Sequence, residues 1–126
     1  MANILLIDDM LPVRRALTTL LESENHRVTQ AQDGAQGIHC LITQKFDLVI
    51  TDILMPRADG LEILNHIEAM PSKPPVIAIS GGSISMSADH ALIIAKKKSN
   101  VILKKPVNNI VLLTAVNKLL RESQAA

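Results

Sequence analysis

Short apolar runs alternate with longer amphipathic stretches along the whole chain. The apolar runs have the length and composition of buried β-strands. They predict strands at residues 3–7, 27–31, 47–51, 75–80 and 101–104. The longer stretches repeat apolar residues every three or four positions, as one face of an α-helix does. They predict helices at residues 12–23, about 34–44, about 60–70, 87–98 and 108–122.

The alternation of strands and helices predicts the fold class. Most of the strands are apolar on both faces, whereas RVTQA (27–31) alternates as a strand near a sheet edge does. Repeated βα units with such strands indicate a parallel sheet covered by helices on both sides. Right-handed crossovers and five strands favour a doubly wound, flavodoxin-like α/β sheet with the order 2-1-3-4-5. We expect one domain over residues 1–126.

The first predicted helix shows a clear division into two faces. Pro12 suits the first turn of a helix, where its missing N–H group costs nothing. The apolar face carries Val13, Ala16, Leu17, Leu20 and Leu21. We expect Arg14, Arg15 and Glu22 on the opposite face, toward solvent.

Composition excludes several classes of protein. Apolar residues make up 48% and charged residues 20% of the chain, which is ordinary for a globular domain. No apolar run is long enough to span a membrane and the N-terminus has no signal-peptide pattern, so we expect a cytoplasmic protein. A net charge of +1 and the absence of Trp and Tyr argue against a nucleic-acid surface. The single cysteine, Cys40, is expected to be a small buried residue.

Polar side chains follow the predicted strands at their carboxyl ends. In sheets of this kind, ligands bind at that edge, beside the point where the strand order reverses. The side chains expected there are Asp8 and Asp9 after the first strand, Thr51 and Asp52 at the third, Ser80 at the fourth, and Lys104 and Lys105 at the fifth.

Three carboxylates at one edge require a cation, because each raises the pKa of the others. A set of oxygen ligands suits Mg²⁺, while zinc would call for His or Cys. Lys105 and Ser80 suit the oxygens of a phosphoryl group. No glycine-rich phosphate loop is present, so we do not expect a bound nucleotide. A carboxylate can itself accept a phosphoryl group, and Asp52 is the best placed to do so.

Four segments, LLIDDM, LVITDILMPRADGLEIL, VIAISGG and ILKKPV, resemble the receiver domain of two-component response regulators. The resemblance covers essentially the whole chain. It implies that Asp52 is the phosphoacceptor and Asp9 a direct Mg²⁺ ligand, with Asp8 acting mainly through a metal-bound water. It further implies that the backbone carbonyl of Leu54 is a metal ligand.

The same resemblance assigns roles at the fourth and fifth strands. Ser80 matches the Ser or Thr that follows the phosphoryl group, and Lys105 matches the lysine that precedes a cis proline. Lys104, one residue earlier, is expected to be a solvated neighbour. The family usually carries an aromatic switch residue three places before the lysine, where this chain has Ile102. Two glycines in SGGSISMS (80–87) lead us to expect the conformational change in loop 81–87 instead.

The implied function is that of a stand-alone, chemotaxis-type receiver. It would take a phosphoryl group from a histidine kinase or a histidine phosphotransfer protein. The chain ends soon after its last helix, so we expect no attached output domain and a signal passed on in trans. Residues 91–95 and 109–116 are apolar over more than one helix face. This pattern favours a partner or homodimer surface on helix four, strand five and helix five, unless Ile93, Val111 and Leu113 are all buried.

Other interpretations remain open at this stage. Asp9 could simply cap the first helix, and His26, His39, His66 and His90 are expected to be surface residues. The chain could be a phosphorelay intermediate. A degenerate receiver that acts as a scaffold is disfavoured, because the acidic, hydroxyl and lysine positions are all intact. A Mg²⁺-dependent phosphohydrolase with an aspartyl nucleophile is disfavoured. Such enzymes carry a second Asp two residues after the nucleophile, where Leu54 stands here.

Overall fold

The chain folds as a five-stranded parallel sheet in a computed structural model, which describes residues 2–53, 59–81 and 97–125. The strands are β1 (Asn3–Ile7), β2 (Arg27–Ala31), β3 (Leu48–Asp52), β4 (Val76–Ser80) and β5 (Val101–Lys104). Their order is β2-β1-β3-β4-β5, and each neighbouring pair is parallel. The predicted fold class and strand order are therefore confirmed, with β2 at an edge as expected.

The described helices are α1 (Leu11–Ser23), α2 (Gly34–Thr43), α3 (Asp59–Glu68) and α5 (Asn109–Ala125). Most of the helix expected at 87–98 lies outside the described residues, together with Ile93, His90 and loop 82–87. The last helix continues to Ala125, three residues beyond the predicted end at 122, and the helix expected to reach 70 ends at Glu68. Asp52 is the last residue of β3, whereas the sequence pattern ended this strand one residue earlier.

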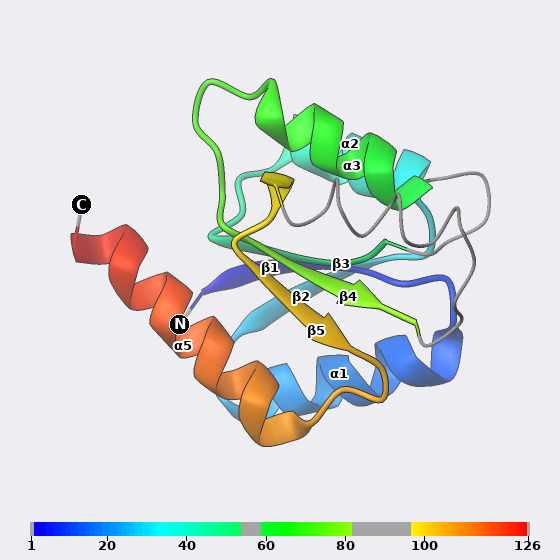
Figure 1. Cartoon of the computed structure of the whole chain (residues 1–126), viewed down its shortest axis with the longest axis vertical. Helices are drawn as coiled ribbons and strands as arrows, with labels where there is room; N and C mark the ends of the chain where they lie inside the picture. The colour runs from blue at the N-terminus through cyan, green and yellow to red at the C-terminus, as the bar shows by residue number, and fades with distance from the viewer. Residues whose placement is uncertain (1, 54–58, 82–96, 126) are drawn as a thin grey trace.

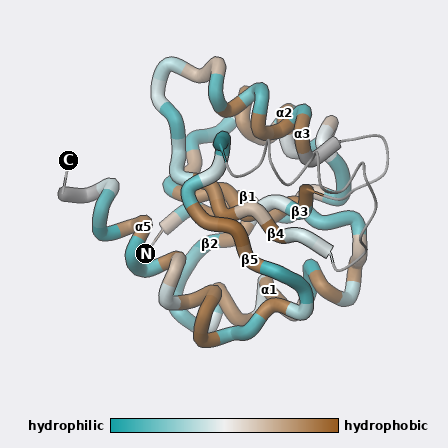
Figure 2. The backbone as a smooth tube through the Cα atoms, viewed as in Figure 1, coloured by the Kyte–Doolittle hydropathy of each residue, from teal (hydrophilic) through white to brown (hydrophobic). Residues whose placement is uncertain are grey.

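The helices cover both faces of the sheet. Helices α2 and α3 lie on one face, and α1 and α5 lie on the other (Figure 1). The sheet strands form the apolar interior between these two layers (Figure 2). Because successive side chains of a strand point to opposite faces, each strand contributes to two cores.

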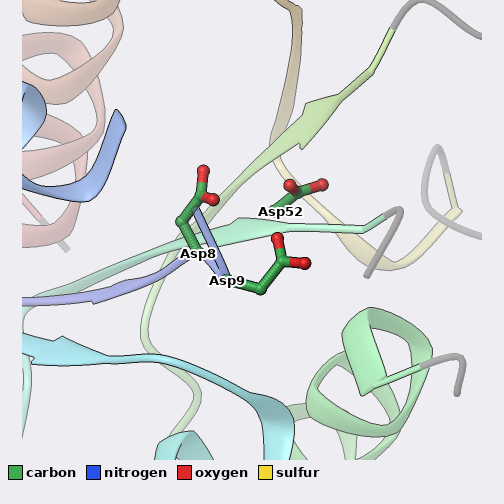
Figure 3. Close-up of side chains that lie close together, drawn as sticks. All are labelled: Asp8, Asp9 and Asp52. Carbon is green, nitrogen blue, oxygen red and sulfur yellow. The ribbon is translucent and has the colours of Figure 1, made fainter. Parts of the chain in front are cut away.

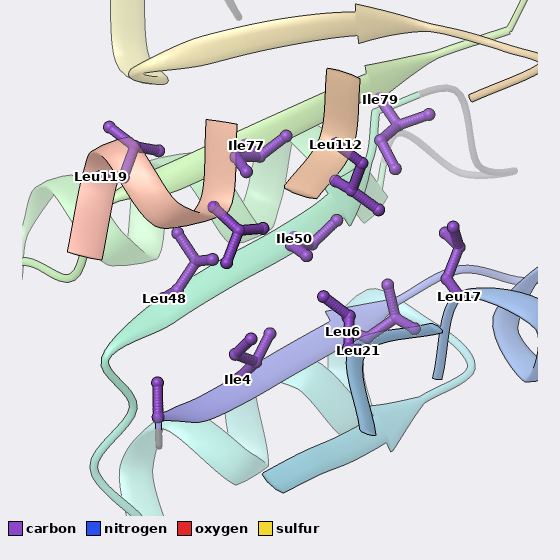
Figure 4. Close-up of a cluster of buried hydrophobic side chains, with 12 residues drawn as sticks. Ile4, Leu6, Leu17, Leu21, Leu48, Ile50, Ile77, Ile79, Leu112 and Leu119 are labelled. Atoms are coloured by element: carbon purple, nitrogen blue, oxygen red, sulfur yellow. The ribbon is translucent and has the colours of Figure 1, made fainter. Parts of the chain in front are cut away.

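The two cores use alternate residues of the same strands. On the side of α1 and α5, Ile4, Leu6, Leu48, Ile50, Ile77 and Ile79 pack with Leu17, Leu21, Leu112 and Leu119 (Figure 4). On the side of α2 and α3, buried Leu5, Ile7, Val49, Val76 and Ala78 pack with Ile63, Leu64 and Ile67. Burial on both faces fixes the register of the strands, and therefore which polar residues emerge at their carboxyl ends.

Helix α1 differs from its predicted division into faces. Pro12 lies in its first turn, and Leu17 and Leu21 are buried, as expected. Ala16 is exposed, however, and Arg14 is half-buried rather than turned to solvent. The cap residue is Met10, which makes no side-chain cap hydrogen bond, so Asp9 does not cap the helix.

Helix α5 keeps apolar side chains on its outer surface. Leu112 and Val116 are buried, but Ile110 is 76% and Val111 49% exposed. Leu113 is half-buried. The exposure of Val111 keeps the partner-surface interpretation open on this helix.

Two smaller expectations concern burial. Cys40 is half-buried beside the core under α2, rather than fully buried. His39 is exposed as expected, but His26 is half-buried and its Nδ1 accepts a hydrogen bond from the Ala2 N–H at 3.2 Å. Within the described ranges, no helix has the length and apolar character needed to cross a membrane.

Candidate metal site at the carboxyl end of the sheet

Two adjacent parallel strands bring three carboxylates together. Ile7 of β1 pairs with Thr51 of β3, so the residues that follow them, Asp8 and Asp52, lie side by side. Asp9 comes next in the turn toward α1. One carboxylate oxygen from each of Asp8, Asp9 and Asp52 lies within 4.8 Å of the other two (Figure 3). The predicted convergence of these three residues is confirmed.

The two neighbouring aspartates have different surroundings. Asp8 is 1% exposed, whereas Asp9 is exposed. The Asp8 N–H donates to the Ala31 carbonyl at 3.1 Å, which ties the end of β1 to β2. Its Oδ1 accepts a hydrogen bond from the Met10 N–H at 2.8 Å. The Asp8 backbone is therefore tied to β2, and one oxygen of its carboxylate is held by the Met10 N–H.

Lys105 neutralises part of the negative charge. Its Nζ donates to Asp52 Oδ2 at 2.7 Å and lies 3.2 Å from Asp8 Oδ2. Its backbone N–H donates to the Ser80 carbonyl at 2.8 Å. Burial alone would lower the pKa of Lys105. The hydrogen bond to Asp52 and the negative charges of Asp52 and Asp8 outweigh that effect, so its pKa is raised.

The acidic group fits a metal ion. Asp8 Oδ2 is buried and makes no hydrogen bond with any described residue, despite its proximity to the Lys105 ammonium. Burial is the main reason that the pKa of Asp8 is raised, and the charge of Asp52 adds to it, while the Met10 N–H and Lys105 oppose it. A buried carboxylate oxygen that is paired with Lys105 but makes no hydrogen bond, beside two further carboxylates, belongs to a set of ligands that a hard divalent cation satisfies. The three aspartates could therefore hold such an ion, and Mg²⁺ suits their oxygen ligands.

The other predicted site residues that the structure describes lie at the same edge of the sheet. Ser80 is buried at the end of β4, one position beyond Ile79, which pairs with Asp52. Lys104 is exposed, as expected of a solvated neighbour, and the Lys105–Pro106 peptide is cis. Leu54, expected to supply a backbone ligand, lies outside the described residues.

Ile102 stands at the position where the resemblance implies an aromatic switch residue. Its side chain is half-buried and packs against the core on the side of α2 and α3. The sequence placed the conformational change in loop 81–87, of which residues 82–87 lie outside the described residues, so that expectation remains a prediction.

Arg14 is a site neighbour that the sequence pattern missed. Its Nη1 donates to the Asp8 carbonyl at 2.7 Å and its Nε donates to Gln30 Oε1 at 3.1 Å. Helical side chains point back toward the N-terminus of their helix, so a long side chain one turn into α1 reaches the preceding turn. That direction was the available signal, but the 3.6-residue period placed Arg14 on the solvent face.

Comparison with known proteins identifies the family. Residues 4–117 match the response regulator receiver domain. The chain is 32% identical over 126 residues to the transcriptional regulatory protein GlrR of Escherichia coli, covering 99% of this chain and 28% of that protein. It is 32% identical over 114 residues to the CAI-1 autoinducer sensor kinase/phosphatase CqsS of Vibrio cholerae, covering 90% of this chain and 17% of that protein.

A solved structure of the same kind agrees with the fold. A response regulator receiver domain protein from Clostridium thermocellum superimposes with a TM-score of 0.85 at 28% identity, covering 99% of this chain and 98% of that one. The chain spans less than a third of the length of GlrR and CqsS, at 28% and 17%. Its match over residues 4–117 places it plainly: the chain belongs to the response regulator receiver domain family.

Proposed function

We propose that this chain accepts a phosphoryl group on Asp52, from a phosphohistidine of a histidine kinase or a histidine phosphotransfer protein. The observation that carries the proposal is the contact of Asp52 with Lys105 at 2.7 Å, beside the carboxylates of Asp8 and Asp9. Receiver domains are typically non-enzymatic signalling modules that interact with histidine kinases. The acidic cluster and the lysine supply what such a reaction needs: a nucleophile, a cation site and a positive charge.

The reaction would be a direct transfer. A carboxylate oxygen of Asp52 forms a bond to phosphorus while the bond between phosphorus and the donor's imidazole nitrogen breaks. The other nitrogen of the donor's ring carries a proton, so the imidazole leaves with the electron pair of that bond as the neutral ring. A Mg²⁺ ion held by Asp8, Asp9, Asp52 and the Leu54 carbonyl would neutralise negative charge on the phosphoryl oxygens.

Lys105 and Ser80 would act on the product. The Lys105 ammonium, which contacts Asp52 in the unmodified protein, would move to a phosphoryl oxygen. The Ser80 hydroxyl would donate to another phosphoryl oxygen. These shifts would change the carboxyl ends of β4 and β5, next to the start of α5. We propose that a downstream protein recognises this change on a surface formed by the helix expected at residues 87–98 together with β5 and α5, or that the phosphoryl group itself is passed on.

The proposal is tested with Mg²⁺ and acetyl phosphate, a small phosphodonor that needs no partner protein. Intact-mass measurement should show a gain of one phosphoryl group that is stable in acid and labile in base. The gain should be absent in Asp52→Asn and retained in Asp47→Asn, an aspartate at the opposite end of β3.

Three outcomes would count against the proposal. If wild type gains no phosphoryl group, phosphoacceptance is wrong. If Asp52→Asn is labelled to the same extent as wild type, the assignment of Asp52 is wrong. Continuous release of phosphate from phosphomonoesters would favour the phosphohydrolase alternative instead.

A further inference from the structure

Arg14 links three elements beside the acidic cluster. Its Nη1 donates to the Asp8 carbonyl at 2.7 Å, and its Nε donates to the Gln30 side chain of β2 at 3.1 Å. Its own backbone N–H donates to the Met10 carbonyl at 3.0 Å, as the first turn of α1 requires. One half-buried guanidinium thus joins the end of β1, the edge strand β2 and the start of α1.

The contact with Asp8 falls on a peptide group that matters for both aspartates. The Asp8 carbonyl belongs to the peptide that joins Asp8 to Asp9, so fixing its oxygen fixes the orientation of that peptide plane. Within the described part of the chain, the exposed Asp9 side chain has no hydrogen bond or ion pair of its own. The direction in which the Asp9 carboxylate leaves the backbone therefore depends on how this peptide is held.

We propose that Arg14 is a positioning residue for the metal site: it holds the Asp8–Asp9 peptide so that both carboxylates face Asp52. This inference rests on the proposed Mg²⁺ site and adds to it a residue that touches none of the three carboxylates. Residues that orient metal ligands by hydrogen bonds commonly change metal affinity by about 10- to 100-fold when they are replaced.

Simple electrostatics predicts the opposite change in Mg²⁺ affinity when Arg14 is replaced by a neutral residue. Removing a positive charge near an acidic site makes the site more negative, which should strengthen the binding of a cation. Loss of a positioning contact should weaken binding, because the ligands must then be ordered when the ion binds. The direction of the change in Mg²⁺ affinity therefore separates the two effects.

The experiment measures Mg²⁺ dissociation constants by isothermal titration calorimetry for wild type, Arg14→Gln, Arg14→Lys and Arg15→Gln. Arg15 is the matched control, because it carries the same charge one residue further along α1, is exposed, and its side chain has no polar contact among the described residues. We expect Arg14→Gln to bind Mg²⁺ about 10-fold more weakly than wild type. Arg14→Lys keeps the charge but replaces the two guanidinium nitrogens that make these bonds with a single ammonium nitrogen, so it should also bind more weakly. Arg15→Gln should bind as wild type does or slightly more tightly.

Stability is measured on the same samples by denaturant unfolding without Mg²⁺. A merely structural Arg14 would lower the free energy of unfolding and leave the Mg²⁺ affinity of the folded protein unchanged. If Arg14→Gln fails to fold, Gln30→Met removes only the acceptor of the Nε–H and should weaken Mg²⁺ binding by a smaller factor than is expected for Arg14→Gln.

The Mg²⁺ affinity of wild type separates a failure of this inference from a failure of the proposed Mg²⁺ site. If wild type does not bind Mg²⁺, the metal site itself is wrong, and the role of Arg14 falls with it. If wild type binds Mg²⁺ but Arg14→Gln binds equally well or more tightly, only the inference about Arg14 is overturned. In the fallback case, an unchanged Mg²⁺ affinity of Gln30→Met overturns it.

Discussion

At the scale of single residues, the pair Asp8–Asp9 combines one buried and one exposed carboxylate. Asp8 contacts the backbone of Ala31 and Met10 and the Lys105 ammonium. Asp9 is exposed to solvent. Burial without a full set of donors makes the charge of Asp8 costly. A bound divalent cation would offset that cost, so the site favours a metal at the expense of the stability of the metal-free protein.

This cost predicts the effect of Asp8→Asn. Because the pKa of Asp8 is raised, chiefly by burial, the ionised carboxylate at neutral pH opposes folding in the absence of metal. An amide keeps an oxygen for the Met10 N–H and removes the charge. We expect Asp8→Asn to raise the free energy of unfolding of the metal-free protein at neutral pH, measured with urea. The same change should abolish the stabilisation that Mg²⁺ gives wild type.

Asp9→Asn is the matched control for this prediction. Asp9 is exposed, so its replacement should change the free energy of unfolding without metal by no more than about 0.5 kcal/mol. It should still lose Mg²⁺ stabilisation. A metal-free Asp8→Asn protein less stable than wild type would show that the contacts of the Asp8 charge outweigh its burial.

The sequence predicted which residues form the site, but not how they are held. Asp52 and Ser80 end their strands, and Asp8, Asp9 and Lys105 directly follow the ends of theirs, so their convergence followed from the pattern of parallel strands. The difference between Asp8 and Asp9 depends on Ala31 and Lys105, which are distant in the chain. The role of Arg14 depends on side-chain direction, which a periodic pattern does not contain.

At the scale of elements, α2 packs closely against the sheet and α3. A Cβ atom added at Gly37 would lie 2.6 Å from Ile7 Cδ1 and 2.8 Å from Ile63 Cδ1. Both isoleucines are fully buried, so their side chains have little room to move. The absence of a side chain at Gly37 therefore sets the distance at which α2 lies from β1.

Gly37→Ala tests this close approach. Alanine is favoured over glycine in a helix interior by about 1 kcal/mol, but overpacking a core costs about 1–3 kcal/mol. We expect a net loss of about 1 kcal/mol in the free energy of unfolding, measured with urea. In an Ile7→Val background, which lacks the Cδ1 atom, the same change should be less costly or neutral. A stabilised single variant would show that the two isoleucines move aside freely.

At the scale of the whole molecule, the candidate site occupies one end of the sheet. At the other end, hydrogen bonds join the N-terminal segment to the residues at the start of β2. There the Arg27 N–H donates to the Ala2 carbonyl at 2.8 Å, and His26 Nδ1 accepts from the Ala2 N–H at 3.2 Å. The sequence pattern predicted the order of the strands, because hydrophobic periodicity and crossover handedness determine it. It placed His26 at the surface, because a lone histidine carries no pattern that reveals a distant backbone partner.

This arrangement makes the stability of the whole domain depend on pH. Burial disfavours the imidazolium and lowers the pKa of His26 below its ordinary value of 6.5. As the pH falls, the unfolded chain takes up this proton first, so the stabilisation is complete above that value and is lost as the pH drops through the folded pKa. Protonation of Nδ1 also removes the acceptor for the Ala2 N–H.

His26→Asn should reduce this dependence on pH, because an amide oxygen can accept a hydrogen bond and does not titrate. Between about pH 7.5 and about pH 5.5 we expect wild type to lose more free energy of unfolding than His26→Asn, at no more than about 1.4 kcal/mol per pH unit. His39→Asn, on the exposed side of α2, should follow wild type. Equal slopes for wild type and His26→Asn would mean that the hydrogen bond to Ala2 does not link protonation to folding. A difference confined to His26 would place the origin of this pH dependence at the end of the sheet opposite the candidate metal site.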